Sequence, residues 1–183
     1  NVEDMNDPPV NLSVTNGLDI TENQLVSSVV GDFSASDEDA NATLVYELVN
    51  GSGGSDNGLF TLETNGTLRT AVTFDFESNA STYTILVRAR DEHNASIEGN
   101  FSVNLLDLPE NPYGLSSSSE LRIAENLPVG SFVTVFTATD PDVNATLKYY
   151  LYDENATPGN AYFELDLNGT LRTTAVLDYE TNA

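Results

Sequence analysis

Apolar and polar residues alternate along most of the first hundred positions of this chain. A period of two is typical of β-strands that bury one face, and helical spacing of apolar residues does not occur. The longest alternating run is Tyr83, Ile85, Val87 and Ala89. The other predicted strands carry Leu18 with Ile20, Phe33 with Ala35, Leu44 with Tyr46 and Leu48, Phe60 with Leu62, Leu68 with Val72, and Phe101 with Val103 and Leu105.

These runs make about seven strands in roughly 100 residues, separated by turns rich in Asn, Gly and Asp. That number and spacing predict an all-β fold, a Greek-key β-sandwich of immunoglobulin-like type.

The pattern repeats. Residues 22–80 return without a gap as residues 125–183, at a constant shift of 103 positions and with about half of the residues identical. The chain is therefore predicted to hold tandem sandwiches: residues 1–10 are the end of a preceding repeat or a linker, residues 11–110 are repeat 1, and residues 111–183 are repeat 2. Repeat 2 lacks counterparts of the last two strands, so its sandwich is predicted to be incomplete. Either the sequence stops inside the repeat, or another chain adds the strands.

The charge is strongly one-sided, with 29 Asp and Glu against 6 Lys and Arg and a formal net charge of -23. Such a chain repels nucleic acid, which excludes it as a partner. The absence of Cys removes disulfides, thiolate metal sites and thiol nucleophiles together. No apolar run is long enough for a membrane helix, so no membrane segment is predicted.

The acidic residues fall at the two ends, or poles, of each predicted sandwich. One pole of repeat 1 gathers Asp37, Asp39, the carbonyl of Asn41, and Asp91. The opposite pole gathers Glu22, Asp75, Glu77 and the exit segment at Asp107, and its copies in repeat 2 are Glu125, Asp178 and Glu180. If sandwiches stack end to end, one junction brings together Glu22, Asp75, Glu77, Asp107, Glu110, Asp140, Asp142 and Asn144.

Carboxylates at such spacing repel one another unless a cation neutralises them. Ca²⁺ fits, because it takes 6 to 8 oxygen ligands in flexible geometry, whereas Mg²⁺ keeps several waters. Zinc and copper call for imidazole or thiolate, and His93 is the only imidazole in the chain. The alternative is that turn carboxylates are simply solvated or cap their own backbone.

Five motifs in this order resemble those of cadherin repeats. They are Asp4-Met5-Asn6-Asp7-Pro8-Pro9 for the linker, Glu22-Asn23, Asp37-x-Asp39-x-Asn41, Phe74-Asp75-Phe76-Glu77, and Ala89-Arg90-Asp91. The resemblance covers nearly the whole chain. It implies that Asp4, Asn6 and Asp7 are also ligands and that a junction holds up to three Ca²⁺ ions, which stiffen the array into a rod.

The second linker departs from the family pattern. It reads Asp107-Leu108-Pro109-Glu110, so Pro109 stands where the family has an Asn ligand. Proline offers only a carbonyl oxygen, and we expect the ion nearest repeat 2 to be weakened or lost.

Ten Asn-x-Ser/Thr sequences predict N-glycosylation acceptors on a secreted surface, if the host attaches such glycans. The alternative, equally open here, is that small polar turn residues produce the pattern incidentally. The asparagines are Asn11, Asn41, Asn50, Asn65, Asn79, Asn94, Asn100, Asn144, Asn155 and Asn168.

The leading functional prediction is a Ca²⁺-stiffened structural or adhesive segment of an extracellular or cell-surface protein. Its partners would be the neighbouring repeats and, by homophilic or fibre-forming association, other copies. The alternative is a calcium-dependent carbohydrate-binding module that uses exposed Tyr150 and Tyr152. No catalytic constellation is present, so an enzyme is not predicted.

Overall fold

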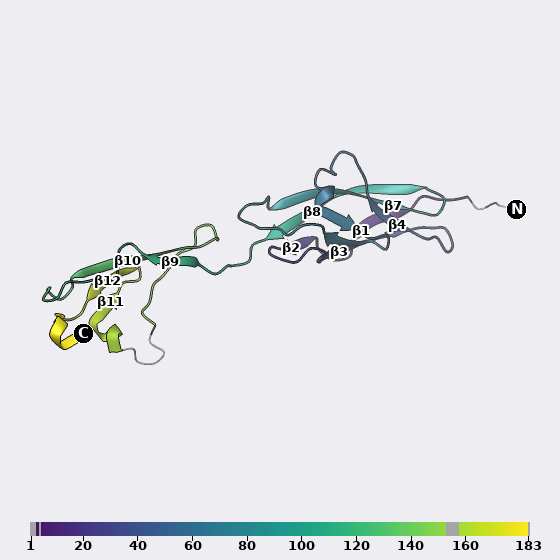
Figure 1. The fold of residues 1–183 in the computed structure, drawn as a ribbon. Helices are drawn as coiled ribbons and strands as arrows, with labels where there is room; N and C mark the ends of the chain where they lie inside the picture. Colours follow the sequence, from purple (N-terminus) through teal and green to yellow (C-terminus); the bar gives the residue numbers. More distant parts are fainter. Residues whose placement is uncertain (1–2, 4, 153–157, 183) are drawn as a thin grey trace. The chain divides into compact units, whose positions relative to one another are not determined.

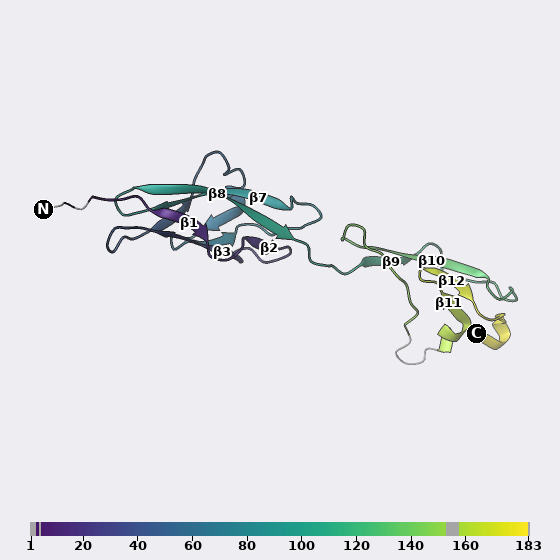
Figure 2. The ribbon, with the colours of Figure 1, turned by 180° about the vertical axis from the view of Figure 1, so that it is seen from behind.

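The computed structural model of the protein describes residue 3, residues 5–152 and residues 158–182. The chain divides into two compact units, unit 1 (Asn1–Leu108) and unit 2 (Pro109–Ala183). Figures 1 and 2 show the ribbon from opposite sides.

Unit 1 is a sandwich of two four-stranded sheets. The first has the strand order β1-β3-β6-β5, with every neighbouring pair antiparallel. The second has the order β2-β8-β7-β4, in which β2 runs parallel to β8. The strands are β1 (Val10–Val14), β2 (Asp19–Thr21), β3 (Val29–Ser36), β4 (Val45–Leu48), β5 (Phe60–Leu62), β6 (Thr67–Thr70), β7 (Thr82–Arg90) and β8 (Ser96–Leu106).

The core between these sheets follows the alternation in the sequence. Tyr83, Ile85, Val87 and Ala89 of β7 are all buried, as predicted. Across the sandwich, the ring of Phe101 meets Phe33 edge to face at a centroid distance of 4.8 Å. The predicted all-β fold is confirmed, although β1 was not among the expected strands. A short 3₁₀ turn, η1 (Asn57–Leu59), precedes β5.

One glycine fixes the turn between β5 and β6. Gly66 has φ of +100°, and a Cβ there would lie 2.5 Å from the carbonyl oxygen of Phe33. Only glycine tolerates both conditions, which explains the Asn-Gly-Thr sequence of this turn. Gly169, at the same place in unit 2, also has a positive φ and approaches Phe136 in the same way.

Unit 2 pairs its strands in one sheet of order β11-β12-β10-β9. The described part of the unit contains no second sheet. Besides these strands, it holds a 3₁₀ turn and a one-turn helix where no helix was expected. Its elements are β9 (Tyr113–Ser117), β10 (Phe132–Thr139), η2 (Pro158–Tyr162), β11 (Phe163–Leu165), β12 (Thr170–Thr173) and α1 (Tyr179–Asn182).

Candidate metal centre

Glu22 organises one pole of unit 1. It follows β2 directly, and only 1% of its surface is exposed. Its Oε2 accepts the backbone N–H of Phe76 at 2.7 Å, and its Oε1 accepts that of Leu108 at 2.9 Å. One buried carboxylate therefore holds both the loop before β7 and the segment that leaves β8.

Asp75 shapes the loop before β7. Its Oδ1 accepts the N–H groups of Glu77 and Ser78 at 3.1 and 3.2 Å, while its own N–H donates to Oδ1 of Asn79 at 3.0 Å. This local network positions Glu77. One carboxylate oxygen each from Glu22, Glu77 and Asp107 then lies within 4.8 Å of the other two. Asp75 is outside this group of three.

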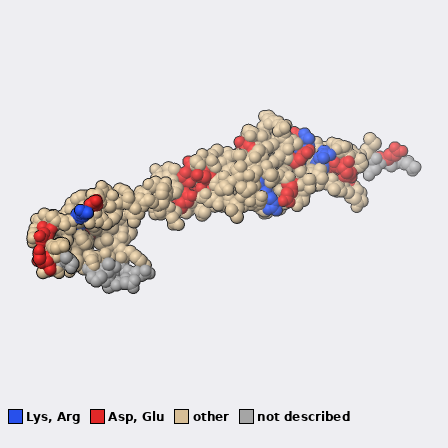
Figure 3. Space-filling model, in the orientation of Figure 1, with Lys and Arg blue, Asp and Glu red and all other residues tan. Residues whose placement is uncertain are grey.

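The chemistry of this pole suits a hard cation. Three carboxylates that face one another at such distances repel, and a cation would relieve the repulsion. The group is made of oxygen ligands only, from one sandwich pole, which fits Ca²⁺ better than zinc or copper. On the face of unit 1 seen in Figure 3, Asp and Glu gather toward both ends, with Lys and Arg between them.

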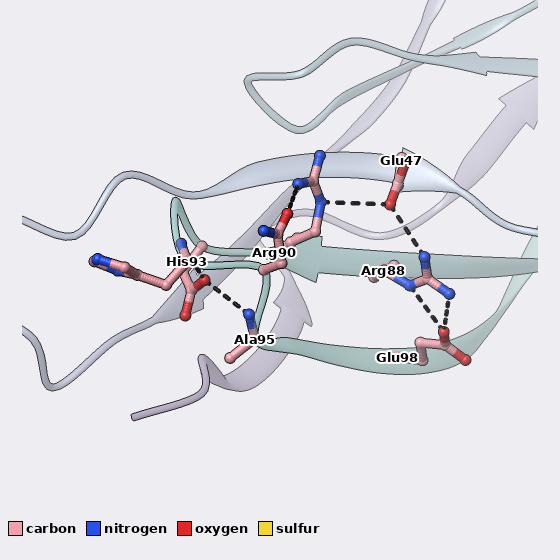
Figure 4. A network of polar contacts seen from close by, with 8 residues as sticks. Glu47, Arg88, Arg90, His93, Ala95 and Glu98 are labelled. Atoms are coloured by element: carbon pink, nitrogen blue, oxygen red, sulfur yellow. Dashed lines mark hydrogen bonds and ion pairs between the residues drawn. The ribbon is translucent and has the colours of Figure 1, made fainter. Parts of the chain in front are cut away.

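Asp91 anchors the opposite pole of unit 1. The side chain is buried after β7, and its Oδ1 accepts the N–H groups of His93 at 2.8 Å and Ala95 at 2.9 Å. Its Oδ2 accepts the Asn6 side-chain amide at 2.9 Å. That bond, followed by the backbone donors, lowers the pKa of Asp91 below its ordinary value despite the opposing effect of burial. His93 lies in a turn, as expected, and its backbone N–H is one of the donors to Asp91 (Figure 4).

The Asp37-x-Asp39-x-Asn41 turn completes this pole. Oδ1 of Asp37 accepts the N–H of Asp39 at 2.9 Å, and Oδ2 of Asp39 accepts the N–H of Asp7 at 2.9 Å. The other oxygen of Asp37 is buried and has no hydrogen-bond partner among the described residues. Asn41 adopts a left-handed backbone with φ of 67°. A buried carboxylate oxygen without a donor is costly and suits a cation ligand.

Unit 2 repeats the geometry of the Asp37-x-Asp39-x-Asn41 turn at the same shift of 103. Asp140 accepts the N–H of Asp142 at 3.1 Å, and Asp142 accepts the N–H of Glu110 at 3.0 Å. Asn144 has the same φ as Asn41, 67°. The repeated sequence therefore encodes repeated hydrogen bonds.

The other pole of unit 2 copies the Glu22 pole. Glu125 accepts the N–H of Tyr179 at 3.1 Å, and Asp178 accepts that of Glu180 at 3.1 Å. Oxygens of Glu125, Asp178 and Glu180 lie within 4.8 Å of one another. Hydrogen bonding with Glu180 is the largest effect that lowers the pKa of Asp178. Unlike Glu22, Glu125 is exposed.

Two predicted residues, Asp4 and Asn155, lie outside the described residues. Of the asparagines in sequons, Asn65 and Asn168 use Oδ1 to accept the N–H two positions later, at 3.1 Å in both units. These are local turn bonds, which support the turn role of the Asn-Gly-Thr sequences. Glycosylation of any of the ten asparagines stays a prediction.

Three contributors were missed from the sequence. Asn23 and Asn126, which follow Glu22 and Glu125, both have φ of 60°. Asn tolerates this left-handed backbone better than most residues, and the recurring Glu-Asn pair was the available signal. Glu92 accepts the N–H of Thr43 at 2.9 Å, which lowers the pKa of Glu92 and ties the turn to β7. Residue 92 lies outside the repeated segment 22–80, so the repeat gave no signal for it.

Together, the fold and these poles define a class: an immunoglobulin-like sandwich repeated in tandem, with acidic clusters at both ends of each repeat. A sequence model of the Cadherin domain matches residues 17–106 and again residues 119–183. The chain therefore belongs to the cadherin family. Cadherin domains are generally calcium-dependent adhesion repeats of extracellular proteins, and the family is non-enzymatic.

Individual relatives agree. Cadherin-2 of Gallus gallus is 30% identical over 196 residues, which cover 98% of this chain and 21% of that protein. Protocadherin Fat 4 of Mus musculus is 31% identical over 172 residues, 89% of this chain and 3% of that protein. The chain thus spans about a fifth or less of these relatives. None of the helices in the described part of the chain is long and apolar enough to cross a membrane.

Solved structures share the fold. The EC1-2 fragment of human protocadherin-24 matches with a TM-score of 0.69 at 20% identity, covering 98% of this chain and 82% of that one. Protocadherin gamma B7 extracellular cadherin domains 1–4 match with a TM-score of 0.61 at 26% identity, covering 94% and 42%.

Proposed function

We propose that this chain is a calcium-binding structural segment of an extracellular or cell-surface adhesion protein, in which Ca²⁺ stiffens the junctions between repeats. The observation that best supports this proposal is that carboxylate oxygens of Glu22, Glu77 and Asp107 lie within 4.8 Å of one another in unit 1. Glu22 is held there by two backbone donors, so the group is positioned by the fold. It lies where the chain leaves the first repeat.

The proposed junction combines two half-sites. Unit 1 supplies Glu22, Asp75, Glu77 and Asp107, and unit 2 supplies Glu110, Asp140, Asp142 and Asn144. Asp107 and Glu110 are three residues apart, so their backbones can be separated by at most about 11 Å. The short covalent linker is therefore compatible with both sets of oxygens sharing cations in the proposed junction. Ca²⁺ would supply the positive charge that these carboxylates require.

The junction is proposed to hold fewer ions than the family pattern implies. Pro109 occupies the position of Asn6, whose amide donates to Asp91 in unit 1. Proline has no side-chain amide. We therefore expect the ion nearest repeat 2 to bind most weakly here.

The remaining acidic sets would serve the neighbouring junctions. Asp4, Asn6, Asp7, Asp37, Asp39, Asn41 and Asp91 would face a preceding repeat, and Glu125, Asp178 and Glu180 a following one. Homophilic or fibre-forming association with other copies is part of the same proposal. A stiff array would then transmit force between attachment points, and its stiffness would vary from junction to junction.

Thermal unfolding tests this proposal. The 183-residue chain should melt at a higher temperature in millimolar Ca²⁺ than in chelator, because ligand that binds only the folded state stabilises it. Mg²⁺ at the same concentration controls for simple charge screening. Identical melting curves in Ca²⁺ and chelator would refute calcium binding.

A carbohydrate-binding role is the second candidate, supported by one observation. Tyr150 and Tyr152 are 69% and 76% exposed, as such a platform requires. Their counterparts in unit 1 are Glu47, which is in β4, and Val49, which directly follows it. Retention on insoluble polysaccharides that is lost in a Tyr150→Ala, Tyr152→Ala variant would favour this role over the structural one.

A further inference from the structure

Five asparagines of this chain are followed directly by glycine. The backbone nitrogen of the residue after an asparagine can attack the side-chain amide carbon and close a five-membered ring. Glycine favours this reaction, because without a Cβ its backbone reaches the geometry of attack at little cost. The five asparagines are Asn16, Asn50, Asn57, Asn65 and Asn168.

The two copies of the Asn-Gly-Thr turn are held in the same way. Oδ1 of Asn65 accepts the N–H of Thr67 at 3.1 Å, and the N–H of Gly66 donates to the carbonyl of Glu63 at 2.9 Å. Asn168 and the glycine that follows it make the same two bonds in unit 2, at 3.1 and 2.8 Å. Both the amide and the nitrogen that would attack it are engaged, so ring closure first has to break the turn.

Asn57 is held by its side chain. Its Nδ2 donates to the carbonyl of Val49 at 2.8 Å, and its Oδ1 accepts the N–H of Leu86 at 3.1 Å. The residue is half-buried and begins the 3₁₀ turn η1. These bonds fix the orientation of the amide, which cannot rotate toward the nitrogen of Gly58 without breaking them.

Asn50 is held least of the five. It is exposed, between the end of β4 and a stretch, residues 51–55, that contains three glycines. Among the described residues, none forms a hydrogen bond with its side chain or with the N–H of Gly51. The amide and the attacking nitrogen are therefore both available, and the glycines that follow leave the backbone free to bring them together.

Asn16 is intermediate. It is exposed, and its side chain has no hydrogen bond within the described part of the chain. However, the carboxylate of Asp19 lies beside Gly17, since Oδ2 would be 3.4 Å from a Cβ at that glycine. The attacking nitrogen must lose its proton, and a neighbouring negative charge opposes that loss.

We propose that Asn50 is a site of spontaneous deamidation, which the fold selects, ahead of Asn16, from the five Asn-Gly pairs. The nitrogen of Gly51, deprotonated by hydroxide, forms a bond with Cγ of Asn50, while the Cγ–Nδ2 bond breaks and ammonia leaves. Water then opens the cyclic imide on either side and gives aspartate or isoaspartate. Each conversion adds one negative charge and removes the acceptor amide of the Asn50-Gly51-Ser52 sequon.

Isoaspartate at position 50 changes the packing of the loop as well. The backbone of Gly51 lies against Leu86, because a Cβ at this glycine would be only 2.7 Å from Cδ2 of Leu86. Leu86 alternates with the core residues of β7 and yet is only 7% exposed, so the loop helps to cover it on the outer side of the sheet. Isoaspartate inserts one more atom into the backbone of this loop. Leu86 should then become more exposed.

The experiment incubates the folded 183-residue chain at mildly alkaline pH and follows the mass gain of the peptides that carry each Asn-Gly pair. We expect Asn50 to convert at least about tenfold faster than the three held asparagines, because those must first break hydrogen bonds. Incubation in concentrated urea is the control, since unfolding removes the bonds and should make the five rates similar. Asp19→Asn should raise the rate at Asn16 and leave the rate at Asn50 unchanged.

Equal rates at the five sites in the folded chain, or faster conversion at Asn65 than at Asn50, would overturn the proposal. A spread of rates that persists in urea would assign the order to local sequence and would overturn the role of the fold. As isoaspartate accumulates, exchange of the Leu86 amide should become faster. Asn50→Gln is the matched variant, which should keep slow exchange there through the same incubation, and equal exchange in the two proteins would contradict the change in loop packing.

Discussion

Oε1 of Glu22 accepts the backbone N–H of Leu108 at 2.9 Å, across 86 positions of the sequence. Glu22, which is buried directly after β2, thus holds the segment that follows β8. The same carboxylate also accepts the N–H of Phe76. The side chain of Glu22 is therefore held in place within its cluster with Glu77 and Asp107.

Glu22→Gln should destabilise unit 1 even without calcium. Gln has one acceptor oxygen in place of two, so one buried N–H loses its partner, at a cost of about 1–3 kcal/mol. Urea unfolding in chelator measures this cost. Glu125→Gln is the matched control, because Glu125 is exposed and has one such bond. Equal losses in the two variants would show that burial of Glu22 is not responsible.

Gly66→Ala should destabilise unit 1 by more than about 1 kcal/mol, because the new Cβ meets the carbonyl of Phe33 in a left-handed backbone. Gly58→Ala is the control, since nothing lies within 4 Å of a Cβ there. Denaturant midpoints of the two variants provide the comparison. A Gly66→Ala protein as stable as the Gly58→Ala protein would contradict the described turn.

Acid unfolding should reveal the lowered pKa of Asp91. A carboxyl with a depressed folded pKa contributes stability that is present above its unfolded value, near 3.9, and is lost as pH falls through the folded value. Asp91→Asn should therefore be less stable than the wild type at pH 7, and the difference should vanish at the lowest pH. In chelator, Asn6→Ala should move this loss toward higher pH, because Asn6 is the largest cause of the lowered pKa.

The strands of unit 1 were predictable where one face is buried, as in the run from Tyr83 to Ala89. Strand β1 was not, because its register is interrupted between Val10 and Ser13 and Asn11 has a positive φ. Residues 148–151 copy β4 in the repeat, yet that segment is not a strand in the structure. A strand needs a hydrogen-bonded neighbour, which local alternation does not encode.

The acidic poles were predictable because their residues recur at a shift of 103. The hydrogen bonds that position these acidic residues were harder to predict. The donors to Glu22 are backbone groups of Phe76 and Leu108, and a backbone N–H leaves no mark in the sequence. The linker deviation at Pro109 was visible in the sequence, because Pro109 stands at the position that Asn6 holds in the first linker.

The most direct test of the account is isothermal titration calorimetry of the 183-residue chain with Ca²⁺. We expect a measurable heat of binding for at least one Ca²⁺ ion. An Asp75→Ala, Glu77→Ala variant should lose this binding. An Asp37→Ala, Asp39→Ala variant, altered at the other pole of unit 1, should keep that binding. Circular dichroism confirms that both variants are folded. Binding that is unchanged by the first pair of substitutions, or no binding by the wild type, would contradict a calcium centre at the exit of unit 1.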